Sequence, residues 1–243
     1  MIILVTKNGV FLCTMRVLFV HQNFPSQFKF LAPKLVSLGH DVSAFTLRQN
    51  APSNWAGVKL FRYSIDRENA QNAHPWTVDF ESKVVRGEAC CRAAIILRKR
   101  GYYPDVIIAH PGWGESLFLK QVWPNSLLKL YCEYFYRPTG QDVGFDPEFA
   151  KADEADAGRV LLKNANILVQ FEQSEFAISP TRWQTQTFPE RLRGSITTLH
   201  DGVDTVNASP DPTAELRIDG GLTLSKADEV VTFVNRTLEP YRG

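Results

Sequence analysis

The sequence has no excess of charge of either sign. Its 243 residues include 27 basic and 26 acidic side chains, a formal net charge of +1, and there is no acidic or basic tail. Proteins that bind DNA or RNA through their surface charge need clustered Lys and Arg, so we expect no nucleic acid as a partner.

Patterns that hold metals or form disulfide frameworks are also missing. The four cysteines, Cys13, Cys90, Cys91 and Cys132, form no CxxC pair and no His/Cys cluster with zinc spacing. We therefore expect reduced thiols, no metal site and a cytoplasmic protein. The first apolar stretch is interrupted by Lys7, Asn8 and Arg16 and falls short of the roughly 20 residues that a membrane span needs.

Common catalytic signatures are absent as well. There is no Walker A loop, no GxSxG and no Ser/His/Asp order, and the first predicted strand is not followed by G-x-G-x-x-G. The last absence argues against a dinucleotide-binding or epimerase-type Rossmann protein.

Short apolar runs that alternate with longer amphipathic stretches are present, with 44% hydrophobic residues overall. The pattern predicts strands at 17–20, 42–46, 58–63, 105–109, 127–131, 167–170 and 195–199. It predicts helices at 26–38, 75–100, 147–164 and 174–178, and a turn-rich segment at 179–189. This alternation is typical of an α/β fold, a Rossmann-like parallel sheet with helices on both faces.

Changes in composition suggest three parts. Residues 15–205 form the Rossmann-like domain, and residues 1–14 are either an upstream extension or an extra edge strand. The Pro- and Gly-containing stretch 206–226 reads as a linker, and the apolar run from Glu229 reads as the first strand of a second domain, so we assign 206–243 to linker and truncated second domain.

Polar loops follow several predicted strands, and right-handed crossovers bring such loops to one edge of the sheet. The first contains Gln22, Asn23 and Ser26, and Ser26 is placed to cap a helix whose N–H groups favour an anion. A polar turn with Phe24 packed beneath it explains that loop equally well.

Three further loops carry candidate side chains. They contain His110 and Trp113, then Glu133 and Tyr134, and last His200, Asp201 and Asp204. Structural alternatives stay open for each of them: a lone histidine is more often structural, aromatic clusters are often packing, and Asp201-Gly202 suits a simple turn.

Five segments together resemble the N-terminal part of family 4 glycosyltransferases, which have the two-domain GT-B fold. The segments are 15–25, 104–111, 179–183, 200–204 and 235–243, and the resemblance covers almost everything from Met15 onward. It implies transfer of a sugar from a nucleotide-diphosphate donor to a hydroxyl acceptor, with retention at the anomeric carbon and without cofactor or essential metal.

The resemblance also implies roles for residues. His110 is the catalytic residue beside the reacting sugar, and Arg236 and Arg242, with Ser26 and Asn23, bind the donor diphosphate. From their places in the polar loops after the strands, we expect an acceptor site or cleft formed by Gln22, Trp113, Glu133, Tyr134, His200, Asp201 and Asp204. Two positions depart from the family pattern, because Arg242 stands where relatives have lysine and Ser26 where many have glycine.

The same resemblance sets the expected partners. They are a nucleotide sugar, a glycan or lipid-linked acceptor, and a missing C-terminal domain or complementary chain that supplies the donor site. We therefore expect this chain to be inactive alone, and lipid-linked acceptors would place it peripherally at a membrane. The alternative is a non-catalytic module that binds a glycan or a lipid head group.

Overall fold

The computed structural model describes residues 3–6, 9–12, 14–141, 143, 145, 148 and 155–233. The strands are β1 (Ile3–Thr6), β2 (Gly9–Leu12), β3 (Arg16–Val20), β4 (Asp41–Thr46), β5 (Asn54–Trp55), β6 (Val58–Arg62), β7 (Val106–Ala109), β8 (Leu127–Tyr131), β9 (Phe176–Ser179), β10 (Ile196–Thr198), β11 (Leu216–Ile218) and β12 (Leu222–Leu224). The helices are η1 (Ser26–Phe28), α1 (Leu31–Ser37), α2 (Val78–Lys99), η2 (Pro111–Trp113), α3 (Leu119–Val122), α4 (Asp156–Glu172), α5 (Arg182–Thr187) and α6 (Glu190–Arg193).

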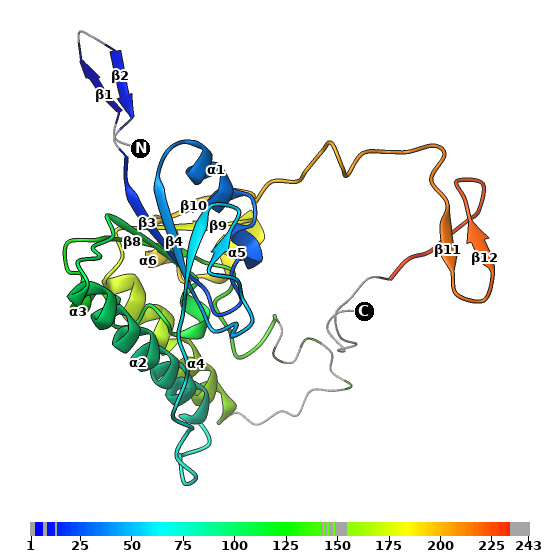
Figure 1. Ribbon diagram of the computed structural model, residues 1–243. Coiled ribbons are helices and arrows are strands. Elements are labelled where there is room, and N and C mark those ends of the chain that lie inside the picture. Colours follow the sequence, from blue (N-terminus) through cyan, green and yellow to red (C-terminus); the bar gives the residue numbers. More distant parts are fainter. Residues whose placement is uncertain are drawn as a thin grey trace.

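An eight-stranded sheet in the order β10-β9-β8-β7-β3-β4-β6-β5 forms the centre of the protein. All neighbours in it are parallel except β5, which pairs antiparallel with β6. The helices α2, α3 and α4 lie over one face of the sheet and α1 lies over the other (Figure 1). The predicted Rossmann-like fold with helices on both faces is confirmed.

The central strand β3 shows why this sequence builds a two-sided core. Its side chains alternate, so Leu18 and Val20 enter one hydrophobic cluster while Val17 and Phe19 enter the other. A strand that is buried on both faces must be apolar throughout, which is how parallel strands between two helical layers read in sequence.

The longest helix, α2, has charges that suit its dipole. Asp79 and Glu81 lie in its first turn, and Arg98 and Lys99 lie in its last. The helix ends before Gly101, whose φ of 83° is the left-handed conformation that glycine adopts most easily. Both the helix and its glycine stop agree with the prediction for 75–100.

Other elements differ from the sequence prediction. The predicted helix 26–38 is divided into η1 and α1, and Ser26 has a φ of 41° and makes no side-chain cap, so its predicted capping role is wrong. Residues 167–170, predicted as a strand, lie inside α4, and the strand β9 comes where a helix was predicted at 174–178. Short apolar runs fit a buried helix as well as a strand, which explains the exchange.

Two segments after β9 also depart from expectation in detail. Residues 182–187, predicted as turns, form α5, and the predicted linker contains the small hairpin of β11 and β12. Residues 229–233 form no strand and are exposed, and the remainder of the predicted terminal strand lies outside the described residues.

Candidate functional site

Two histidines meet at the carboxyl edge of the central strands. His21 follows β3 and His110 follows β7, and their ring centroids lie 5.8 Å apart at an interplanar angle of 83°. Within the sheet, β3 lies between β4, the next strand along the chain, and β7, which follows much later in the sequence. The strand order therefore reverses direction at β3. Open α/β sheets bind ligands in the crevice beyond such a reversal of strand order. The two rings therefore mark the place where a ligand is expected.

Hydrogen bonds orient the ring of His110. Its Nδ1 accepts the backbone N–H of Gly112 at 3.1 Å. A backbone N–H can only donate, so the neutral ring carries its hydrogen on Nε2. That nitrogen donates to Oε2 of Glu133 at 3.1 Å. Both ring nitrogens are thus held, one by the loop after β7 and one by the loop after β8.

Glu133 is the more accessible member of this pair. Its side chain is 45% exposed, whereas that of His110 is 9% exposed. The hydrogen bond from His110 lowers the pKa of Glu133, against the opposing effect of burial. A carboxylate has about four lone-pair sites, so Glu133 keeps acceptor capacity for the hydroxyl groups of a ligand.

The environment keeps the ring of His21 uncharged at neutral pH. Burial lowers the pKa of His21 to about 4, with a further contribution from the neighbouring His110 and an opposing one from Glu133. Its Nδ1 accepts the backbone N–H of Asn23 at 3.0 Å. The neutral ring therefore carries its hydrogen on Nε2, as His110 does.

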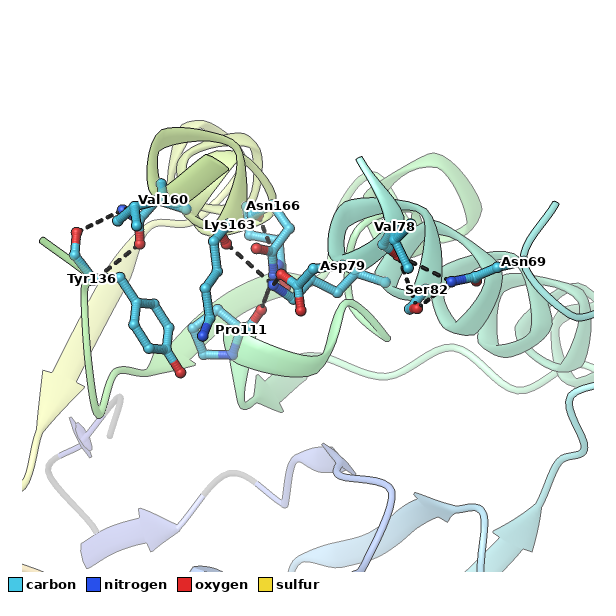
Figure 2. Close-up of polar contacts among 12 residues, drawn as sticks. Asn69, Val78, Asp79, Ser82, Pro111, Tyr136, Val160, Lys163 and Asn166 are labelled. Carbon is cyan, nitrogen blue, oxygen red and sulfur yellow. Dashed lines mark hydrogen bonds and ion pairs between the residues drawn. The ribbon is translucent and has the colours of Figure 1, made fainter. Parts of the chain in front are cut away.

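Amide side chains of α4 hold the loop that carries His110. The carbonyl oxygen of Pro111 accepts a hydrogen bond from Asn166 at 2.7 Å (Figure 2). It accepts a second from Gln170 at 2.9 Å, and both amide side chains are buried. The hydroxyl of Ser116 donates to the side-chain oxygen of Gln170. The loop is therefore fixed by a helix that follows it by more than forty positions in the chain.

A cavity of about 230 Å³ opens beside the ring of His110. It is lined by Asp79 and Lys83 of α2, by His110, Pro111, Gly112 and Trp113, by Glu133, Tyr134 and Tyr136, and by Lys163 and Ile167 of α4. Lys83 pairs with Asp79 and donates to the carbonyl oxygen of Lys163 at 3.1 Å. The ammonium group of Lys163 lies 3.7 Å from the centre of the Tyr136 ring, and Figure 2 shows the two side chains running side by side. We call this space the His110 cavity.

Sequence comparison gives the family to which this geometry belongs. The profile described as Glycosyl transferase family 4 group matches residues 38–208, which contain β4 to β10 together with His110 and Glu133. The chain belongs to this glycosyltransferase family. A separate search of curated proteins with the sequence found no match.

Solved structures of glycosyltransferases share the fold of this family 4 chain. The catalytic domain of starch synthase IV from Arabidopsis thaliana, bound to ADP and acarbose, is similar with a TM-score of 0.50 and 12% identity over 86% of the chain. Os79 from O. sativa, in complex with U2F and trichothecene, is similar with a TM-score of 0.51 and 8% identity over 75% of the chain. The family 4 chain spans 55% and 51% of those two proteins, or about half of each.

Several predicted site residues of the family 4 chain come together. His110, Trp113, Glu133 and Tyr134 all line the His110 cavity, although they come from loops after two different strands. Trp113 is 40% exposed, and its ring centroid lies 6.0 Å from that of His110. The structure thus places the predicted catalytic residue among part of the predicted acceptor set.

The predicted residues after β10 line a different cavity. His200, Asp201 and Asp204 face a space of about 580 Å³ together with Gln27 and Lys29. Asp201 is connected to the histidines, because the Tyr131 hydroxyl lies 2.7 Å from both of its carboxylate oxygens and the Tyr131 ring lies 6.2 Å from that of His110.

Asp204 and His200 have mainly local contacts. The Asp204 carboxylate accepts hydrogen bonds from the backbone of Val206 and from Asn207, which lower its pKa, and Nδ1 of His200 accepts the backbone N–H of Gly202. The turn that sequence reasoning kept as the alternative for this loop is therefore present.

Of the residues predicted to bind the donor diphosphate, only Asn23 and Ser26 lie in the described ranges. Asn23 and Ser26 are exposed, and the carbonyl oxygen of Gln22 anchors the loop by accepting from the backbone N–H of Leu47 at 2.9 Å. Arg236 and Arg242 lie outside the described residues. The ligand roles of these residues remain predictions.

His21 and Tyr131 are the site residues that sequence reasoning missed. His21 is the first residue after β3, as His110 is the first after β7, so a comparison of strand ends would have selected it. Tyr131 is the last residue of β8 and of the predicted strand 127–131. Its contact with Asp201 spans 70 positions and has no signal in the local sequence.

Two further properties concern the described ranges only. There, no group of three or more His, Cys, Asp or Glu side chains is arranged to hold a metal ion. None of the helices in that part of the chain has the length and apolar character required to cross a bilayer.

Proposed function

We propose that this chain is the acceptor-side domain of a glycosyltransferase, which moves a sugar from a nucleotide-diphosphate donor to a hydroxyl acceptor. The observation that carries the proposal is the His110–Glu133 hydrogen bond of 3.1 Å beside a cavity at the sheet reversal. Membership of the glycosyl transferase family 4 group supports the reaction class.

The chemistry asks for groups that handle hydroxyls and developing charge. As the bond to the donor sugar breaks, the sugar gains positive character and the diphosphate gains negative charge. In our proposal the carboxylate of Glu133 accepts a hydrogen bond from a hydroxyl in the cavity, and His110 keeps that carboxylate in place. A carboxylate beside the sugar also stabilises its positive character.

The finer features of the reaction come from the family resemblance. They are retention at the anomeric carbon, no essential metal, and binding of the donor diphosphate by Arg236 and Arg242. Arginine suits phosphate oxygens because its planar guanidinium donates two parallel hydrogen bonds. A cytoplasmic location, with or without peripheral contact to a membrane, also remains a prediction.

A donor-binding half completes the proposal. Because the chain spans about half of the similar glycosyltransferases, we expect the donor half to be encoded in frame beyond residue 243 or as a separate chain. The coding DNA after codon 243 is examined first for a second Rossmann pattern. We expect no turnover of labelled UDP-, TDP-, ADP- or GDP-sugars by the 243-residue chain alone and clear transfer once the donor half is added.

Variants connect the reaction to the site. In the assembled enzyme His110→Ala is expected to lower kcat by about a hundredfold, because the Glu133 carboxylate is no longer held in place and a misplacement of about 1 Å can cost that much. Tyr103→Ala is the control, since this side chain is 57% exposed and lies outside the site. Robust turnover by the isolated chain, or a wild-type rate in His110→Ala, would contradict the proposal.

A further inference from the structure

Aromatic side chains extend from the His110 cavity across the neighbouring loop to α5. Tyr134 lines the cavity, and its ring centroid lies 5.8 Å from that of Trp183 at an interplanar angle of 38°. Trp183 is 60% exposed, and Trp113, which also lines the cavity, is 40% exposed. We call Trp113, Tyr134 and Trp183 the aromatic platform.

The two segments that carry Tyr134 and Trp183 are joined to each other. The backbone N–H of Phe135 donates to the Thr187 hydroxyl at the end of α5 at 3.0 Å, and the rings of Phe135 and Phe188 pack 5.5 Å apart. At the start of α5 the Thr181 hydroxyl accepts the backbone N–H of Gln184 at 3.1 Å. Trp183 is therefore held in the first turn of an anchored helix. Because the backbone that carries it is already ordered, ligand binding costs little further conformational entropy there.

The other side of Tyr134 is anchored as well. One residue pair holds the chain after it: the backbone N–H of Tyr136 donates to Asn164 at 2.9 Å, and the Asn164 amide donates back to the Tyr136 carbonyl at 2.8 Å. The ring of Tyr136 does not extend the platform, because the Lys163 ammonium group covers one of its faces. Lys163 instead offers donors at the edge of the cavity.

Charge in the cavity favours a neutral ligand. The carboxylates of Asp79 and Glu133 balance the ammonium groups of Lys83 and Lys163, so neither a cation nor an anion is selected. Charged donors and acceptors next to aromatic faces match a sugar ring, which presents C–H bonds on its face and hydroxyls at its edge. A flat aromatic surface packs against the C–H face of the sugar, and polar groups around its rim hydrogen-bond the hydroxyls.

We propose that the aromatic platform is an extended binding subsite for a neutral oligosaccharide acceptor. One sugar ring occupies the His110 cavity, which Trp113 and Tyr134 line, and the next ring stacks on Trp183. This inference rests on the proposed function, since it names the acceptor class of the same site. It makes Trp183 a residue that selects for acceptor length.

Binding to the 243-residue chain tests the subsite directly. Isothermal titration calorimetry is run with glucose, mannose, galactose and N-acetylglucosamine, with linear trisaccharides of each, and with glucose 6-phosphate as an anionic probe. We expect at least one trisaccharide to bind more tightly than its monosaccharide. Trp183→Ala is expected to raise the Kd of the trisaccharide by roughly fivefold to tenfold, as loss of one stacked ring predicts, and to leave the Kd of the monosaccharide unchanged. Tyr103→Ala, at a comparably exposed aromatic residue away from the site, is the matched control.

Other outcomes overturn the inference. These are no binding of any neutral trisaccharide, equal effects of Trp183→Ala and Tyr103→Ala, or binding of glucose 6-phosphate in preference to every neutral sugar. Failure of the proposed function looks different, because then Trp183-dependent binding persists while the assembled protein transfers no sugar, as in a non-catalytic glycan-binding module. If transfer proceeds with the same preference for long acceptors in wild type and Trp183→Ala, only the inference fails.

Discussion

Each of the five histidines accepts a backbone N–H at its Nδ1. The donors are Met15 for His40, Asn23 for His21, Trp76 for His74, Gly112 for His110 and Gly202 for His200. This contact therefore does not distinguish a site histidine from a structural one. Burial and ring contact do, because of the five only His21 and His110 are both buried and within ring contact of each other.

The buried ring of His21 makes stability depend on pH. Its pKa of about 4 in the folded protein lies below the ordinary value of 6.5, so protonation favours the unfolded chain. The part of the unfolding free energy that depends on the neutral His21 ring is fully present above pH 6.5 and is lost as the pH falls toward 4. The largest possible loss is roughly 3 kcal/mol. We expect His21→Asn, which removes the titrating ring and keeps an acceptor for the Asn23 backbone, to flatten the fall in unfolding free energy between these pH values.

Urea denaturation at several pH values measures this effect. His200→Asn is the matched control, because His200 makes the same local turn but is exposed. Equal pH slopes for wild type and His21→Asn would show that other groups cause the acid sensitivity.

Among the elements, the contact between α2 and the loop after β7 is unusually close. Gly114 has a φ of 93°, and a Cβ built there would lie 2.4 Å from the carbonyl oxygen of Lys83. On the helix side, a Cβ on Gly87 would lie 2.7 Å from the Gly114 carbonyl oxygen. Two glycines thus let the helix approach the loop that orients His110.

Gly114→Ala tests this packing. The substitution meets both the left-handed backbone conformation and the overlap with Lys83, so we expect a loss of about 3 kcal/mol or more in unfolding free energy. Gly101→Ala is the control: its φ of 83° is similar, but nothing lies within 4 Å of the added Cβ. That variant should lose only about 1 kcal/mol. Equal losses in the two variants, measured by urea denaturation, would contradict a role for the close approach.

At the scale of the whole molecule, the sheet and its helices contain the described core, while the chain after them contributes little to it. Residues 205–223 and 225–233 are exposed, and the hairpin β11–β12 lies apart from the sheet (Figure 1). The family match ends at the same point, at residue 208.

Removal of residues 209–243 is therefore expected to leave the domain intact. We expect the unfolding free energy of the shortened chain to stay within about 0.5 kcal/mol of the full value, as for changes away from packed residues. Denaturation of both chains under the same conditions gives the comparison. A much larger loss would show that the later segment packs on the domain, contrary to the boundary predicted at residue 205.

Much of the fold could be predicted because its pattern is local. The apolar spacing and the glycine stops in the sequence predict several elements to within a few residues of their observed bounds. These elements are the strands β3, β4, β6, β7, β8 and β10 and the helix α2. The stretch from α4 to β9 could not be read in this way. Ile167 is buried in a helix, where an apolar run looks like a strand, and the sheet position is taken by residues 176–179 instead.

The sequence by itself determined the fold class, the family and the set of polar residues that follow the strands, because each depends on local periodicity or short motifs. Only the tertiary structure decided which of those residues meet. It paired His110 with Glu133 and His21, joined Asp201 to Tyr131, and placed Trp183 beside Tyr134. These contacts depend on strand order and helix packing across many positions of the chain, and such long-range packing has no counterpart in local sequence spacing.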